Sequence, residues 1–237
     1  MFIAAHADVC TYSGFSSDAD AFIASLPTTA TLGVFRTLNP SYFETHITNG
    51  DILDGIFNGW CIDTDRSIVD FPTTYCAYVY SSYDEYLPSS MIEYPENLDL
   101  INWIVNQDFV GQAYSATEQY TMGDVQVAIW TLTENWIPDP PFLENNVGPY
   151  KQYRVDTIVA SAQANGEGFI PGCIPPQNRM VVLLFPHDCG TFEFPVAQIT
   201  FIPFPIPCVQ VNCETAWGNG DDFPGRNWAT YITYTVQ

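Results

Sequence analysis

A block of helical periodicity inside a strand-rich chain is the feature that most constrains the fold. Three segments place apolar residues at helical spacing, at about 95–108, 121–137 and 154–164. Runs rich in β-branched and aromatic residues flank this block and predict strands, at 28–36, 42–47, 73–81, 179–185, 196–202 and 227–236. The order predicts a mainly β fold with a helical insertion (α+β), a β-sandwich or barrel carrying a three-helix segment. We expect residues 1–237 to form a single β-rich domain with the helical insertion at about 85–170.

Prolines set the expected limits of several elements. Pro95 opens the first helix, because its fixed φ suits the first helical turn. The segment 139–141 is expected to be a loop. Pro203 and Pro205 follow Ile202, so the strand is expected to break there and to continue as edge-like or irregular chain.

The middle helix contains one polar residue inside an apolar run. Thr121 is a suitable N-cap, and Asp124 lies near the positive end of the helix dipole. Gln126 follows Val125 within the face expected to be buried. An unpaired amide in a dry core costs about 1–3 kcal/mol, so Gln126 requires a hydrogen-bonding partner or a covalent one.

The charge balance bears on the expected partners. The chain has 27 acidic residues and 6 basic ones, for a net charge of −21. Nucleic acid is not expected as a partner, because like charges repel. No run of 18 apolar residues is present, so membrane insertion is not expected either.

The cysteines indicate the compartment. Seven cysteines, no CxxC pair and only three histidines favour disulfides over a structural zinc site. An oxidising, extracellular or cell-surface location is therefore expected. Because seven is odd, three disulfides would leave one cysteine free, intermolecular or chemically active.

Two short motifs together resemble a known family. Trp60 precedes Cys61 in an apolar stretch, and the middle helix carries Val125-Gln126-Val127-Ala128-Ile129-Trp130. This pair is similar to the thioester domains of bacterial surface adhesins, in which a cysteine after an aromatic residue is bonded to a glutamine in a hydrophobic-Gln-x-x-hydrophobic motif. The family usually has Thr before the glutamine and Tyr, Phe or Leu before the cysteine, where this chain has Val125 and Trp60. The resemblance covers about residues 30–170.

The resemblance implies an internal thioester between Cys61 and Gln126, with Trp60, Ile129 and Trp130 shielding it. Formation joins the sulfur to the glutamine carbonyl carbon and releases ammonia. An amine on a protein or another partner surface would then be acylated once, so the activity is covalent adhesion and not enzymatic turnover. No cofactor is expected.

Unreactive interpretations of both residues stay open. Cys61 is an alternative candidate for a disulfide with Cys76 across adjacent strands, and Gln126 for a hydrogen-bonded core amide. The alternative function is a disulfide-stabilised structural subunit of an extracellular filament or sheath, which has no reactive bond and assembles with itself. A Ca²⁺-dependent lectin is a third class, with oxygen ligands at 63–65 or 219–222. His187-Asp188-Cys189 is interpreted as a turn that holds a disulfide cysteine.

Overall fold

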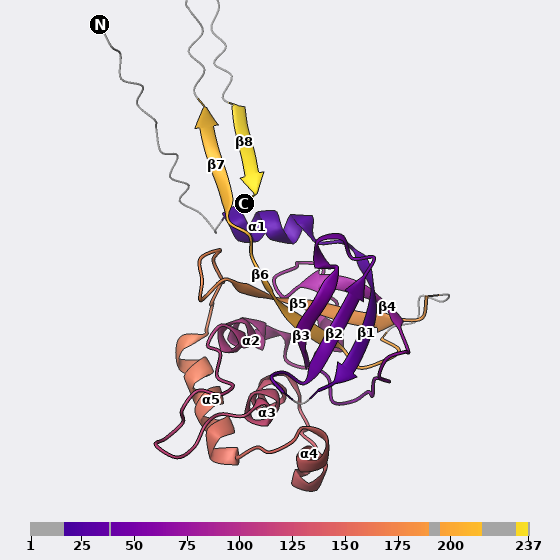
Figure 1. Cartoon of the computed structure of the whole chain (residues 1–237), viewed down its shortest axis with the longest axis vertical. Helices are drawn as coiled ribbons and strands as arrows, with labels where there is room; N and C mark the ends of the chain where they lie inside the picture. The colour runs from indigo at the N-terminus through magenta and orange to yellow at the C-terminus, as the bar shows by residue number, and fades with distance from the viewer. Residues whose placement is uncertain (1–16, 38, 190–194, 215–230, 237) are drawn as a thin grey trace, which may run out of the picture.

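Six antiparallel strands form a closed barrel in the part of the chain that the structure describes (Figure 1). The structure is a computed structural model, and it describes residues 17–37, 39–189, 195–214 and 231–236, with side chains described only between residues 18 and 208. The strands are β1 (Thr29–Arg36), β2 (Phe43–Thr48), β3 (Gly55–Cys61), β4 (Tyr75–Ser81), β5 (Arg179–His187) and β6 (Thr200–Pro205). They neighbour one another in the order β1-β2-β3-β6-β5-β4, and β4 pairs back with β1. Two further strands, β7 (Val209–Glu214) and β8 (Tyr231–Val236), form a separate antiparallel pair.

The helices lie on one side of the barrel. They are α2 (Leu98–Val105), α3 (Met122–Thr133), α4 (Pro140–Asn146) and α5 (Gln152–Asn165), all inside the predicted insertion. In Figure 1, α2, α3 and α5 lie together beside the barrel, and α4 lies beyond α3. A further helix, α1 (Ser17–Ser25), lies at the opposite end, near β7. Short 3-10 turns span Asp51–Leu53, Ser89–Met91 and Pro95–Asn97.

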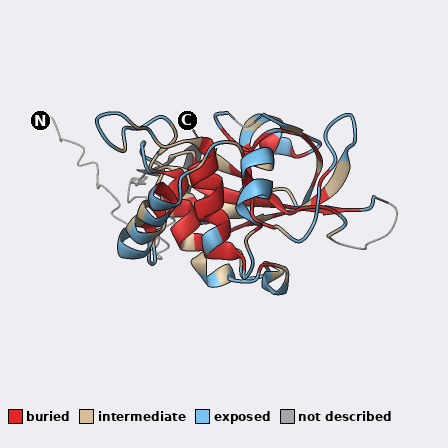
Figure 2. Cartoon of the chain, turned by 90° about the horizontal axis from the view of Figure 1, so that it is seen from below, coloured by how far each residue is buried: buried red, intermediate tan, exposed pale blue. Residues whose placement is uncertain are grey.

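The core runs from the barrel into the helical layer, as the buried residues in Figure 2 show. Eight consecutive residues of β5, from Met180 to His187, are buried, because this strand has the barrel interior on one face and α2 on the other. Helix α3 is also buried, with Thr131 as its one exposed residue. A helix buried on almost all sides lies inside the core, so each polar side chain on it needs a partner within the protein.

Most predicted elements are present, and the differences have local causes. Pro95 opens a 3-10 turn that leads into α2. Helix α4 replaces the loop predicted at 139–141: Asp139 caps it by accepting the Phe142 N–H, and prolines occupy its first turn. The predicted break after Ile202 is wrong, since β6 continues to Pro205. Beyond Phe201 that strand pairs only with β5, so it is edge-like there and tolerates residues without an N–H.

Two disulfides stabilise the described structure and indicate a compartment outside the reducing cytosol. Cys76 bonds to Cys189, and Cys173 bonds to Cys208. The alternative Cys61–Cys76 disulfide is therefore wrong, and Cys61 is the free cysteine of the described residues. Cys10 and the side chain of Cys213 lie outside the described part. Among the described helices, none is long and apolar enough to span a membrane.

Candidate functional site

Cys61 is the last residue of β3, at a point where the sheet stops on one side. On the β6 side the pairing continues, with Cys61 opposite Thr200 and the Ile62 N–H bonded to the Ile199 carbonyl. On the β2 side the pairing ends two residues earlier, at Gly59, because β2 begins at Phe43. The main-chain N–H and C=O of Cys61 therefore have no strand partner on that side, although the residue is completely buried.

The Gln126 side chain forms hydrogen bonds with both of these main-chain groups of Cys61. Its Oε1 accepts the Cys61 N–H at 3.0 Å, and its Nε2 donates to the Cys61 carbonyl at 2.7 Å. A primary amide has one acceptor and donors in the arrangement of a main-chain peptide, so it replaces the missing strand. Gln126 is fully buried, and this pair of bonds satisfies the amide within the protein.

The amide carbon of Gln126 consequently lies beside Cys61. It is bonded to two atoms that each contact the Cys61 main chain, at the distances just given. The Cys61 sulfur is attached to the same residue through Cβ, and rotation about Cα–Cβ is the one side-chain torsion that moves it. The hydrogen bonds of Gln126 go to the main chain and not to the thiol, so a thioester would require these two bonds to rearrange.

The start of α3 is fixed by an aspartate network that sets the position of Gln126. Thr121 and Asp124 form a capping box: Thr121 Oγ1 accepts the Asp124 N–H and Asp124 Oδ2 accepts the Thr121 N–H. The same carboxylate accepts from Arg154 Nε at 2.7 Å and from the Lys151 N–H at 2.7 Å. Asp124 is fully buried and Arg154 is 5% exposed, so this ion pair ties α3 to α5 inside the protein.

Close backbone packing adds to this restraint. A Cβ at Gly123 would lie 2.6 Å from the Pro149 carbonyl oxygen, so the close approach of the two segments requires glycine. At the other end of α3, Thr133 Oγ1 donates to the Ile62 carbonyl at 3.2 Å. Gln126 and Thr133 thus attach the helix to consecutive residues of the chain leaving β3.

The Cys61 thiol lies in a dry pocket. It donates to the Asp63 carbonyl at 2.9 Å and lies 3.7 Å from the Ile199 carbonyl. Burial raises the pKa of the Cys61 thiol well above its usual range, and contact with the Trp130 indole N–H works in the opposite direction. That N–H is buried without an acceptor in standard hydrogen-bond geometry. The thiol is therefore protonated at neutral pH. The Trp130 indole N–H near its sulfur is a hydrogen-bond donor that has no acceptor.

Two carboxyl groups lie near the thiol. Asp63 is 3% exposed, and its carboxylate accepts from the Asp65 N–H and from Arg66. Glu134, the residue that ends α3, accepts from Thr64 Oγ1 at 3.0 Å. Burial raises the pKa of Glu134 to about 7, and the Thr64 hydrogen bond moderates this rise. Glu134 can consequently exchange a proton near neutral pH.

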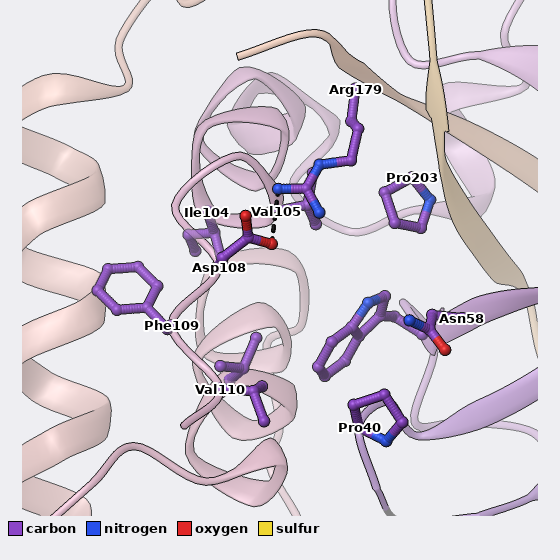
Figure 3. Close-up of a pocket in the computed structure, with 11 residues that line it drawn as sticks. Pro40, Asn58, Ile104, Val105, Asp108, Phe109, Val110, Arg179 and Pro203 are labelled. Carbon is purple, nitrogen blue, oxygen red and sulfur yellow. Dashed lines mark ion pairs between the residues drawn. The ribbon is translucent and has the colours of Figure 1, made fainter. Parts of the chain in front are cut away.

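The residues predicted to shield the pair lie on different sides of it. Ile129 and Trp130 are buried in α3, and the rings of Trp130 and Tyr42 form a T-shaped, edge-to-face contact with centroids 5.7 Å apart. Trp60 precedes Cys61, so its side chain leaves the strand on the opposite face from the thiol. Trp60 lines a different pocket of about 160 Å³, together with Val125, between β3 and α2 (Figure 3). Figure 3 shows the Asp108–Arg179 ion pair (2.7 Å) beside this pocket.

Several residues of the site were not singled out from the sequence. Asp124 was predicted as a helix-start residue, but its buried partner Arg154 was not. Thr64 and Glu134 are separated by 70 positions, and no periodicity joins them.

The described residues of the two candidate Ca²⁺ sites, and those of the His187-Asp188-Cys189 run, are not arranged as a metal site. Among the described residues no cluster of histidine, cysteine and carboxylate side chains is arranged to hold a metal ion. The Asp63 carboxylate is already bonded to Arg66, and residues 219–222 lie outside the described part. Cys189 of the His187-Asp188-Cys189 run is in a disulfide, as interpreted, and His187 stacks on Tyr78.

Comparison of the chain with protein-family models, with curated proteins and with solved structures gives no match. The functional conclusion therefore depends on the geometry of Cys61 and Gln126.

Proposed function

We propose that this chain is an extracellular adhesion domain in which Cys61 and Gln126 form an internal thioester that acylates an amine on a partner surface. One observation carries the proposal: the free cysteine of the described residues lies against a buried glutamine amide, on a helix whose start is held to α5 by a buried ion pair. The two residues are 65 positions apart in the sequence, and they are the two that the family motif names.

The chemistry suits a bond that is made once and kept. The Cys61 sulfur attacks the Gln126 amide carbon, the C–N bond breaks, and the nitrogen leaves as ammonia after taking the thiol proton. Complete burial of both residues excludes water and so slows hydrolysis of the product. The disulfides support an oxidising location, where adhesion domains act.

Intact mass spectrometry tests the proposal directly. The folded chain is expected to weigh one ammonia less than its sequence, after allowing for the hydrogens lost in disulfides. Methylamine is expected to restore mass by forming an amide at Gln126 and to release the Cys61 thiol. Cys61→Ala should have the full mass and should not react, whereas Gln119→Ala, an exposed glutamine, should behave as wild type. Equal methylamine incorporation by Cys61→Ala would reject the thioester.

The alternative is a disulfide-stabilised structural subunit without a reactive bond. The observation that favours it is that both Gln126 hydrogen bonds go to the Cys61 main chain, which satisfies the amide without covalent chemistry. The same mass measurement distinguishes the two, because the structural subunit retains its ammonia. Oligomers that separate only on reduction would add support for the subunit.

A further inference from the structure

A second cleft, of about 70 Å³, is lined by Trp130, which influences the Cys61 thiol, and not by Trp60. It is bordered by Tyr42, Thr64, Trp130 and Gln198, with Arg36 and Arg66 at its edge. A cleft this small holds a few water molecules, so it admits an unbranched alkyl chain more readily than a branched or aromatic group.

The inner wall of this cleft is the wall of the thiol pocket. Trp130 lines the cleft, and its indole N–H acts on the Cys61 thiol by opposing the rise that burial causes in the pKa of that thiol. Gln198 also lines it, and Nε2 of Gln198 donates at 2.6 Å to the Asp63 carbonyl that accepts from the thiol. The pocket near Trp60 has no such link, because Trp60 and Cys61 point to opposite faces of β3. Of the two pockets, the second cleft is therefore the one that shares residues with the surroundings of the Cys61 thiol.

The cleft has an unusual charge for this molecule. The chain has 27 acidic residues, yet no described residue lining the cleft is acidic and two are arginines. Arg66 is paired with Asp63 at 3.1 Å. Arg36 is exposed and, alone among the described arginines, forms no ion pair with a carboxylate.

The neighbours of Arg36 hold its guanidinium in place without neutralising it. Its Nη1 donates to Asn146 Oδ1 at 3.3 Å, and its guanidinium carbon lies 5.5 Å from the centre of the Tyr42 ring. An arginine held by neutral groups keeps donors free for a carboxylate, which it binds in a two-pronged geometry.

We propose that the amine that opens the thioester is a lysine side chain with a neighbouring carboxylate, and that it enters through this cleft while Arg36 binds that carboxylate. This inference rests on the proposed thioester. The lysine stem lies in the cleft, along the walls that Tyr42 and Trp130 form, and the guanidinium distinguishes acidic from basic surroundings. The positive charge also favours the neutral amine, which is the nucleophilic form.

The transfer step balances without another reactant. The lysine nitrogen forms a bond to the Gln126 amide carbon, and the bond from that carbon to the Cys61 sulfur breaks. The electron pair leaves on sulfur, beside the unpaired Trp130 N–H. The proton lost by the amine is taken up by the sulfur, which gives an amide and a free thiol.

The test compares three capped tripeptides, Asp-Lys-Asp, Gly-Lys-Gly and Arg-Lys-Arg, at an ionic strength of about 0.15 M. At this salt the long-range field of the −21 chain, which attracts basic peptides, is screened beyond roughly 8 Å, and local contacts decide. Covalent adducts are counted by intact mass over time, and each rate is divided by that for methylamine. The acidic peptide is expected to react about tenfold faster than the glycine peptide.

Charge reversal at Arg36 sharpens the test. Arg36→Gln should bring the acidic peptide close to the glycine peptide, and Arg36→Glu should favour the basic one. Arg179→Gln is the matched control, because Arg179 is paired with Asp108 beside the other pocket, and it should keep the wild-type order. Equal peptide rates, or an unchanged preference in Arg36→Gln, would overturn this inference while methylamine addition still supports the thioester. Absence of methylamine addition would remove both.

Discussion

At the scale of the residue, the Gln126 amide does structural work whether or not it forms a covalent bond. It is the partner of two buried main-chain groups at the end of β3. If the side chain is shortened, the Cys61 N–H and C=O lose their partners in a place that water does not reach, and each unsatisfied group costs about 1–3 kcal/mol.

We therefore expect Gln126→Ala to lower the free energy of unfolding by about 3–5 kcal/mol, as the lost bonds and the cavity add. Urea unfolding followed by tryptophan fluorescence measures the change. Gln119→Ala, at an exposed position, should change stability by less than about 0.5 kcal/mol. A loss of under about 1 kcal/mol at Gln126 would show that the two main-chain groups find other partners.

Glu134 gives the site a pH dependence with a definite sign. Burial raises the pKa of Glu134 to about 7, so between the ordinary glutamate pKa and 7 the folded state holds a proton that the unfolded state has released. In this window the contribution of Glu134 to the free energy of unfolding falls as pH rises, because the unfolded state gains free energy by releasing this proton while the folded state keeps it.

Glu134→Gln should remove this contribution while keeping an acceptor for Thr64. Between about pH 4.5 and 7, wild type is expected to lose stability relative to the variant as pH rises. Above about pH 7 the difference between their unfolding free energies should stay constant. Urea titrations at several pH values measure this difference, in which the other carboxylates cancel. A difference that does not vary with pH, or that varies in the opposite direction, would contradict the raised pKa.

At the scale of the element, the position of α3 depends on one buried ion pair. Asp124 satisfies the first turn of α3 and holds Arg154 of α5 at 2.7 Å. Removing the carboxylate leaves the guanidinium of Arg154 buried without its charge partner, which costs about 3–5 kcal/mol.

Asp124→Ala is accordingly expected to lower stability by about that amount and to slow formation of the proposed thioester, because the start of α3 no longer fixes Gln126. Asp156→Ala, on the exposed face of α5, is the control and should leave both unchanged. Thermal unfolding and the fraction of chain lacking one ammonia provide the two measurements. Wild-type values of both in Asp124→Ala would rule out this positioning role.

Periodicity and capping made most of these elements predictable. The apolar spacing after Pro95 and after Thr121 indicated α2 and α3, and runs of β-branched and aromatic residues indicated β1, β2, β4, β5 and the start of β6. Strand β3, which ends at Cys61, was not predicted as a strand. Helix α4 was missed because two prolines obscured a capped first turn. The ion pair of Asp124 with Arg154 and the contact of Thr64 with Glu134 join distant parts of the chain, and no local pattern in one sequence records such contacts.

At the scale of the whole molecule, charge and covalent links act on different states. The net charge of −21 disfavours the compact form through self-repulsion, which salt weakens. The two described disulfides instead restrict the unfolded chain, and the restriction grows with the length of chain that each one closes. Cys76 and Cys189 are 113 positions apart, and Cys173 and Cys208 are 35 apart.

The longer closure is expected to contribute more. Loop entropy alone assigns about 5 kcal/mol to Cys76–Cys189 and about 4 kcal/mol to Cys173–Cys208. The Cys76–Cys189 disulfide also joins β4 to the chain just after β5, two strands whose pairing closes part of the barrel. We therefore expect the Cys76→Ala/Cys189→Ala double variant to unfold at a lower urea concentration than the Cys173→Ala/Cys208→Ala variant, with both below wild type. The reverse order would mean that the links act mainly through contacts in the folded barrel and not through the unfolded chain.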